Sequence, residues 1–154
     1  MLNRTKKSNS EGFTIIEVMI VLAIAGLILL IVFLAVPALQ RSSRNTQRKS
    51  DIQRIVGAIT EDSTNKNGKI PTSQAALDSA VGNTKLAYYT AATPVTWKSG
   101  AAAVANPKDD TVVYVSGASC NANGIDAQTG TARQFAVLYT IETSGAYAGA
   151  CIDS

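Results

Sequence analysis

One carboxylate lies within an apolar segment of the sequence that contains no evident partner for it. Glu17 lies four residues after Phe13, inside a run that is otherwise almost wholly apolar. A carboxylate in such a position either caps the start of a helix or pairs with a positive group brought by another element. The residues alone leave these two roles open.

Cys120 and Cys151 are the only cysteines in the 154 residues. They lack the close spacing of a CxxC redox pair and the further ligands of a zinc site, which favours a structural disulfide. A disulfide places the C-terminal part in an oxidising compartment outside the cytoplasm. The sequence has no histidine, the commonest general base and metal ligand. No nucleophile–base constellation or phosphate loop is present, so we expect no enzyme activity, cofactor or metal site.

The carboxylate of Glu17 is positioned by a long apolar segment, Phe13 to Leu39. Within it, residues 18–36 include no charged or polar side chain, and 19 residues of helix span about 28 Å, the thickness of a bilayer core. A cleaved secretory signal would have a shorter apolar region and a small-residue cleavage site after it. The segment therefore predicts a membrane-spanning helix.

After Leu39 the pattern becomes amphipathic, with apolar residues at three- and four-residue steps: Ile52, Ile55, Val56 and Ile59. Stop signals first occur at residues 65–68 and at Pro71. The pattern predicts one helix over about residues 13–63, with a kink or local opening at Pro37.

The remaining residues predict a small head. A capped short helix is expected at residues 72–77, followed by strands at 86–91, 111–116, 134–142 and 146–152, with a hairpin connection at 142–145. The apolar stripe of the long helix needs a partner. The predicted fold class is α+β: a long N-terminal helix, half membrane-spanning and half amphipathic, packed on a small antiparallel sheet of three or four strands.

The residues Gly12 to Val21, GFTIIEVMIV, follow a short leader with Arg4, Lys6 and Lys7 and precede the apolar run. This combination resembles the prepilin signature of type IV pilins. The resemblance implies cleavage after Gly12 by a prepilin peptidase and N-methylation of the exposed Phe13. It also implies a leader at 1–12, a transmembrane and filament-core helix at 13–39, an amphipathic continuation at 40–65 and a globular head at 66–154.

The resemblance also bears on Glu17. Thr14-Ile15-Ile16-Glu17 has the spacing of a capping box, in which Glu17 serves its own helix. In the assembly role that the resemblance favours, Glu17 pairs with the amine of Phe13 on a neighbouring subunit, because an unpaired carboxylate in an apolar bundle is costly. Both roles can hold at once.

The function implied by the resemblance is that of a structural subunit in a type IV pilus-like surface filament, serving adhesion, motility or DNA uptake. Implied partners are other copies of the chain, prepilin peptidase, and the assembly machinery with its membrane platform and, indirectly, an ATPase. The precursor would be a single-pass membrane protein with its head outside the cytoplasm. Basic residues flank the predicted span on both sides and do not fix this orientation.

Two alternatives remain. The close one is a pseudopilin of type II secretion or a minor pilin, against which the C-terminal cysteine pair argues mildly, since major pseudopilins more often rely on a calcium loop. The alternative of another class is a membrane-anchored extracellular binding protein.

Three further features have two interpretations each. The basic stretch from Arg41 to Arg54 could bind nucleic acid or acidic lipids, but is better explained as a polar helix side that pairs with Asp51, Glu61 and Asp62 of the same or adjacent subunits. The CNANGID sequence at 120–126 resembles part of a calcium loop, although one carboxylate favours a plain turn. The aromatic residues are either surface contacts or core; these are Trp97, Tyr88 and Tyr89.

Overall fold

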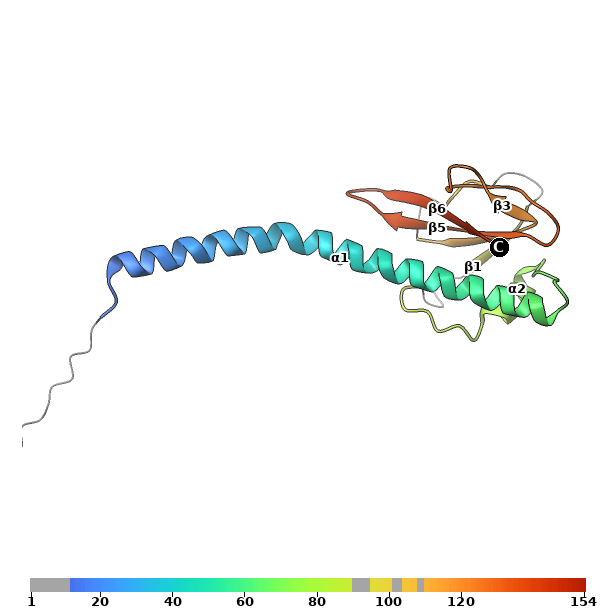
Figure 1. Cartoon of the computed structure of the whole chain (residues 1–154), viewed down its shortest axis with the longest axis horizontal. Helices are drawn as coiled ribbons and strands as arrows, with labels where there is room; N and C mark the ends of the chain where they lie inside the picture. Colours follow the sequence, from blue (N-terminus) through green and yellow to red (C-terminus); the bar gives the residue numbers. More distant parts are fainter. Residues whose placement is uncertain (1–11, 90–94, 101–103, 108–109) are drawn as a thin grey trace, which may run out of the picture. The chain divides into compact units, whose positions relative to one another are not determined.

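The computed structural model describes residues 12–89, 95–100, 104–107 and 110–154. It confirms the predicted α+β class, a long N-terminal helix followed by a small sheet (Figure 1). Contacts divide the chain into two units after Leu39, and each is described by itself. The elements are α1 (Ile15–Asn65), α2 (Gln74–Val81), β1 (Val95–Ser99), β2 (Val112–Ser116), β3 (Ala118–Cys120), β4 (Ala127–Thr129), β5 (Phe135–Glu142) and β6 (Tyr147–Asp153).

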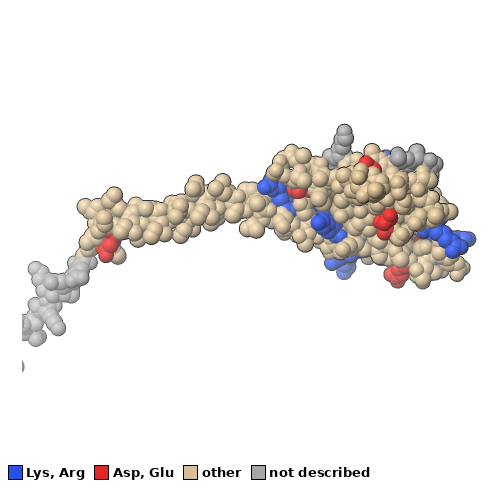
Figure 2. All heavy atoms as spheres, turned by 45° about the horizontal axis from the view of Figure 1, so that its top comes forward, with Lys and Arg blue, Asp and Glu red and all other residues tan. Residues whose placement is uncertain are grey.

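The part of α1 in the first unit is solvent-exposed along its whole length, from its start at Ile15 to Leu39. Its side chains are apolar apart from Glu17, and Figure 2 shows this segment as tan with a red group near its start. The helix continues through Pro37, so the chain does not leave the helical conformation there. Among the described residues, α1 is the one helix long and apolar enough to cross a membrane.

In the second unit, α1 buries the predicted apolar stripe. Ile52, Ile55 and Ile59 are fully buried, and Val56 packs beside them. The helix ends at Asn65 because Asn67 and Gly68 take left-handed conformations, and the N–H of Gly68 donates to the carbonyl of Ser63 at 2.8 Å.

The head sheet has the strand order β1-β2-β5-β6. β2, β5 and β6 match the predicted strands within one residue at each end, and β5 and β6 form the predicted antiparallel hairpin. β1, a strand that the sequence did not predict, pairs with β2 in parallel, so the sheet is antiparallel except at this edge. A connection of about a dozen residues, 100–111, allows this pairing.

The strand predicted at residues 86–91 is also wrong. Residues 86–89 lie in no strand, and 90–91 fall outside the described residues. The reason is that their backbone N–H groups, at Ala87, Tyr88 and Tyr89, donate to the carboxylate of Asp51 rather than to a neighbouring strand.

The short helix α2 has Ser73 as its N-cap, one residue after the start that the sequence predicted. The first residue of α2, Gln74, also closes the outer edge of β1. Its side-chain amide donates to the carbonyl of Val95 at 2.9 Å and accepts from the N–H of Trp97 at 2.7 Å. One side chain thus takes the place of a neighbouring strand.

Both faces of the two central strands, β2 and β5, are buried. The face toward α1 combines the isoleucine stripe with Val112, Tyr114, Phe135 and Val137. Alternate residues of the same strands face the other way and pack with the two-stranded β3–β4 ribbon, which the sequence did not predict: Val113, Val115, Ala136, Leu138, Ala118 and Ala127.

Candidate assembly site at the helix start

The first turn of α1 holds Glu17 in a reciprocal capping box. The backbone N–H and the hydroxyl of Thr14 both donate to Glu17 Oε2, at 2.8 and 2.7 Å, and the Glu17 N–H lies 3.4 Å from Thr14 Oγ1. Two donors at the start of the helix are thereby satisfied within one turn. The capping role that the sequence predicted for Glu17 is therefore present in the structure.

This box does not use the whole carboxylate. Both Thr14 donors go to Oε2, and no described residue donates to Glu17 Oε1. A carboxylate has about four acceptor positions. An external cation can therefore bind Oε1 without displacing the cap.

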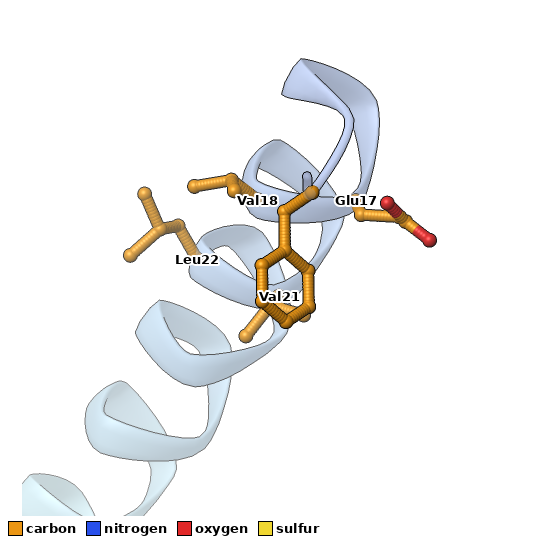
Figure 3. Close-up of a pocket in the computed structure, with 5 residues that line it drawn as sticks. Glu17, Val18, Val21 and Leu22 are labelled. Carbon is orange, nitrogen blue, oxygen red and sulfur yellow. The ribbon is translucent and has the colours of Figure 1, made fainter. Parts of the chain in front are cut away.

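Glu17 lies at the rim of a shallow apolar hollow lined by Phe13, Val18, Val21 and Leu22. Figure 3 shows its carboxylate pointing away from Val18 and Leu22. These apolar side chains are exposed, and Phe13 has 90% of its surface accessible. A partner that covers this surface would enclose the carboxylate as well.

The predicted cleavage bond between Gly12 and Phe13 lies just before α1. Both residues are exposed and belong to no helix or strand, and a Cβ built on Gly12 would meet nothing within 4 Å. An extended, unobstructed peptide is what a protease requires. The leader residues 1–11, with Arg4, Lys6 and Lys7, lie outside the described residues.

The predicted pairing of Cys120 with Cys151 is confirmed. Their Cα atoms are 5.7 Å apart and the disulfide joins β3 to β6, across 31 positions of sequence. It ties the small ribbon to the edge strand of the main sheet. The chain-entropy model gives a loop of this length about 3 to 4 kcal/mol of stabilisation.

A buried arginine organises the polar interactions of the head. The side chain of Arg48 is fully buried, and its Nη2 lies 2.7 Å from Asp110 Oδ1 and 2.9 Å from Glu142 Oε1. Nη2 also donates to the hydroxyl of Tyr88, which in turn donates to Asp110, and Nη1 donates to the carbonyl of Thr140. Two carboxylates thus surround one buried guanidinium.

Glu142, at the end of β5, is held by two further residues of α1. Arg44 donates to both carboxylate oxygens, at 2.9 Å to Oε1 and 2.6 Å to Oε2. The side-chain amide of Asn45 exchanges a pair of 2.8 Å hydrogen bonds with the backbone of Glu142. The hydrogen bonds from Arg44 lower the pKa of Glu142 below its ordinary value.

These contacts correct the expected pairing of the basic stretch. Arg44 and Arg48 pair with Glu142 and Asp110 of the head, not with acids of their own helix. Of the acids that were expected to pair with them, Asp51 binds backbone N–H groups and Asp62 pairs with Lys66 at 2.8 Å. The two arginines are engaged inside the head, which weakens the case for nucleic acid or lipid binding there.

A sequence signal for Arg48 did exist. Arg48, Ile52, Ile55 and Ile59 follow i, i+4, i+7, i+11 spacing, so the arginine lies on the buried stripe. A charge on an apolar stripe indicates a buried partner. The partners themselves lie 62 and 94 positions away and left no comparable signal.

The other candidate features have plain structural roles. Tyr89 is 1% exposed in the core, while Tyr88 and Trp97 are half-buried against it. In the CNANGID segment, Asn121 Oδ1 accepts from the N–H groups of Ile125 and Asp126, as in an ordinary turn. The core and turn interpretations are therefore confirmed.

An exposed apolar helix with a capped carboxylate at its start, followed in sequence by a disulfide-bonded α+β head, fits the class of membrane-anchored proteins with a small folded head. Residues 7–33 match the family model of the prokaryotic N-terminal methylation motif. The chain therefore has a class III prepilin signal peptide, which supports a type IV pilin-like or pseudopilin protein and a structural rather than enzymatic role. Neither the comparison with curated proteins nor that with solved structures found a significant match.

Proposed function

We propose that the chain is the structural subunit of a type IV pilus-like surface filament for adhesion, motility or DNA uptake. The observation that carries the proposal is the methylation motif at residues 7–33, continuous with a helix segment whose apolar side chains are all exposed. An apolar surface of this extent needs lipid before assembly and other helices after it.

In this proposal, prepilin peptidase removes residues 1–12 and Phe13 becomes the methylated N-terminus. Residues 13–39 anchor the precursor in the membrane and later form the filament core, 40–65 continue the helix, and 66–154 form the coat. The disulfide between Cys120 and Cys151 supports a head outside the cytoplasm, where such bonds persist.

Glu17 sets the register between subunits in this proposal. Its Oε1 is open to a donor, and the α-amine created by cleavage at Phe13 supplies a positive one on the neighbouring copy. An uncompensated carboxylate inside an apolar bundle costs several kcal/mol. Subunits out of register would leave Glu17 without a cation, so they are disfavoured.

The test compares two variants at one position. Glu17→Gln keeps an acceptor for the Thr14 cap and removes the charge, whereas Glu17→Val removes both. We expect both variants to be inserted, cleaved and methylated, as mass spectrometry of the mature chain reports, but to give no polymer in sheared cell-surface fractions. Normal filaments from Glu17→Gln would show that the cap suffices and would overturn the pairing role.

The wild-type fractions separate the alternatives. A mature chain recovered as a surface polymer supports the pilus. A chain found only in membranes would instead support an anchored binding protein, and short polymers retained beneath the surface would support a pseudopilin. Imaging filaments on cells that lack this gene then distinguishes a major subunit from a minor one.

A further inference from the structure

The last part of α1 has one side with opposite charges at its two ends. Arg54, Ala58, Glu61 and Asn65 follow i, i+4, i+7, i+11 spacing and so share a side of the helix. Arg54 and Glu61 are exposed and Ala58 between them is half-buried. The side therefore has a cation, a small residue and a carboxylate in line.

The described neighbouring residues add positive charge at the Arg54 end and leave the negative charge of Glu61 uncompensated at the other end. Arg54 donates to the carbonyl of Lys85 at 2.8 Å, which brings a second exposed cation to its end. At the other end, Lys66 neutralises Asp62 at 2.8 Å, while Glu61 forms no hydrogen bond or ion pair with any described residue. Of these two neighbouring acids, Glu61 is therefore the one left without a cation among the described residues.

Glu61 also borders a hollow. A polar depression of about 350 Å³ lies between the end of α1 and the end of α2 with the segment that follows it, lined by Ala58, Glu61, Asn83 and Thr84 among others. An incoming basic side chain finds there an unpaired carboxylate together with amide and hydroxyl oxygens.

The two charged ends cannot satisfy each other within one chain. Arg54 and Glu61 are seven residues apart, about 10 Å along the helix axis. A second copy, parallel and shifted by about that distance, brings its Arg54 level with Glu61. The pairing proposed for the mature N-terminus has the same sense, since Phe13 and Glu17 are four residues or about 6 Å apart.

We infer that Glu61 forms an ion pair with Arg54 of a second copy of this chain. This pair sets the register between subunits in addition to the pair proposed at Glu17. The inference rests on the proposed filament and names the head surface that its subunits share. A two-fold, antiparallel pair of heads would satisfy the same charges. Precursors inserted in one membrane all point the same way, however, so the contact is head-to-tail and repeats without closing.

Charge reversal tests the pair in whole cells. Arg54→Glu and Glu61→Arg alone should each reduce sheared filaments by about fivefold or more, because each places like charges together, and the double reversal should restore at least half of the yield. Lys49→Glu is the matched control, an exposed basic residue on another side of α1, and should leave filaments unchanged. Normal yield from either single reversal, or failure of the double reversal to restore it, overturns the inference.

Cross-linking tests the geometry. A variant with both Arg54→Cys and Glu61→Cys is assembled into filaments, and the filaments are treated with a short bis-maleimide. The inference predicts a ladder of cross-linked multimers, because each subunit contacts one neighbour through position 54 and another through position 61. A band at the dimer only indicates the two-fold pair, and no cross-linked product indicates that the positions are apart; either result overturns the inference. Polymer in the wild-type sheared fraction shows that the proposed function stands even when this pair fails.

Discussion

Glu17 and Glu142 are both satisfied carboxylates, but their partners come from different distances along the chain. Glu17 is held by Thr14, three positions away, and keeps one oxygen open. Glu142 is held by Arg44, Asn45 and Arg48, more than ninety positions away, and both of its oxygens accept. A carboxylate that is hydrogen-bonded only by its sequence neighbours keeps an oxygen available to a new partner. A carboxylate whose partners are distant in sequence instead helps to hold together the fold that brings those partners to it.

The same contrast separates the two units. In the first, the apolar side chains of the described residues are exposed. In the second, even an arginine is buried, with partners on several segments. The first unit is therefore expected to tolerate substitutions until assembly, and the second to respond in its own stability.

The largest effect is expected from Arg48→Met. Removing the cation leaves Asp110 with the Tyr88 hydroxyl but no cation, and Glu142 with one cation fewer, which costs about 3 kcal/mol. The free energy of unfolding of the full chain in detergent can be followed by the fluorescence of Trp97, the single tryptophan, which packs against the core. Glu17→Val is the control and should leave this transition unchanged. Equal destabilisation by both substitutions would remove the distinction between the units.

The next effect is expected from Asp51→Ala. It leaves the N–H groups of Ala87, Tyr88 and Tyr89 without their acceptor in a partly buried position, at a cost of about 2 kcal/mol. Hydrogen exchange of these three amides should accelerate more than exchange in β5. Unchanged protection at residues 87–89 would show that the loop is held by other contacts.

A smaller effect is expected from acidification. The folded pKa of Glu142 lies below its ordinary value, so the stabilisation is present above about pH 4.3 and is lost as the pH falls through the lowered value. Glu142→Gln should therefore flatten the decrease in head stability below that pH. The same decrease in the variant and the wild type would assign the acid sensitivity to other carboxylates.

The smallest effect is expected from Thr14→Val. This change removes the hydroxyl that caps the start of α1, at about 1 kcal/mol of helix stability, but leaves Glu17, the backbone N–H of residue 14 that donates to it and the mature amine in place. Filament yield in sheared fractions should stay within about twofold of the wild type, since capping contributes only this modest term. A loss as complete as that of Glu17→Gln would show that the two carboxylate roles cannot be separated.

The sequence was most informative where structure is local or periodic. The helix, its isoleucine stripe, the hairpin of β5 and β6 and the capping box all follow from neighbouring residues. The cysteine pair was found because the sequence offers no other partner. β1 and its parallel pairing with β2 were missed because this five-residue edge strand has no clear alternation of apolar and polar residues, and its register depends on a connection with little periodic pattern.

The polar core was missed for a related reason. The position of Arg48 on the stripe indicated burial, but the choice of Asp110 and Glu142 as partners depends on tertiary packing. The strand predicted at 86–91 failed because a side chain, Asp51, competes for backbone donors that sequence propensity assigns to a sheet.

The amide of Gln74 that closes β1 matters most when many heads are crowded together. A sheet edge with free N–H and C=O groups is a template for strand exchange between neighbours, and a filament holds its neighbours at very high local concentration. By occupying Val95 and Trp97, Gln74 leaves the head less able to form sheets with adjacent heads. In the proposed filament, heads protected in this way would remain separate folds although their helices pack together.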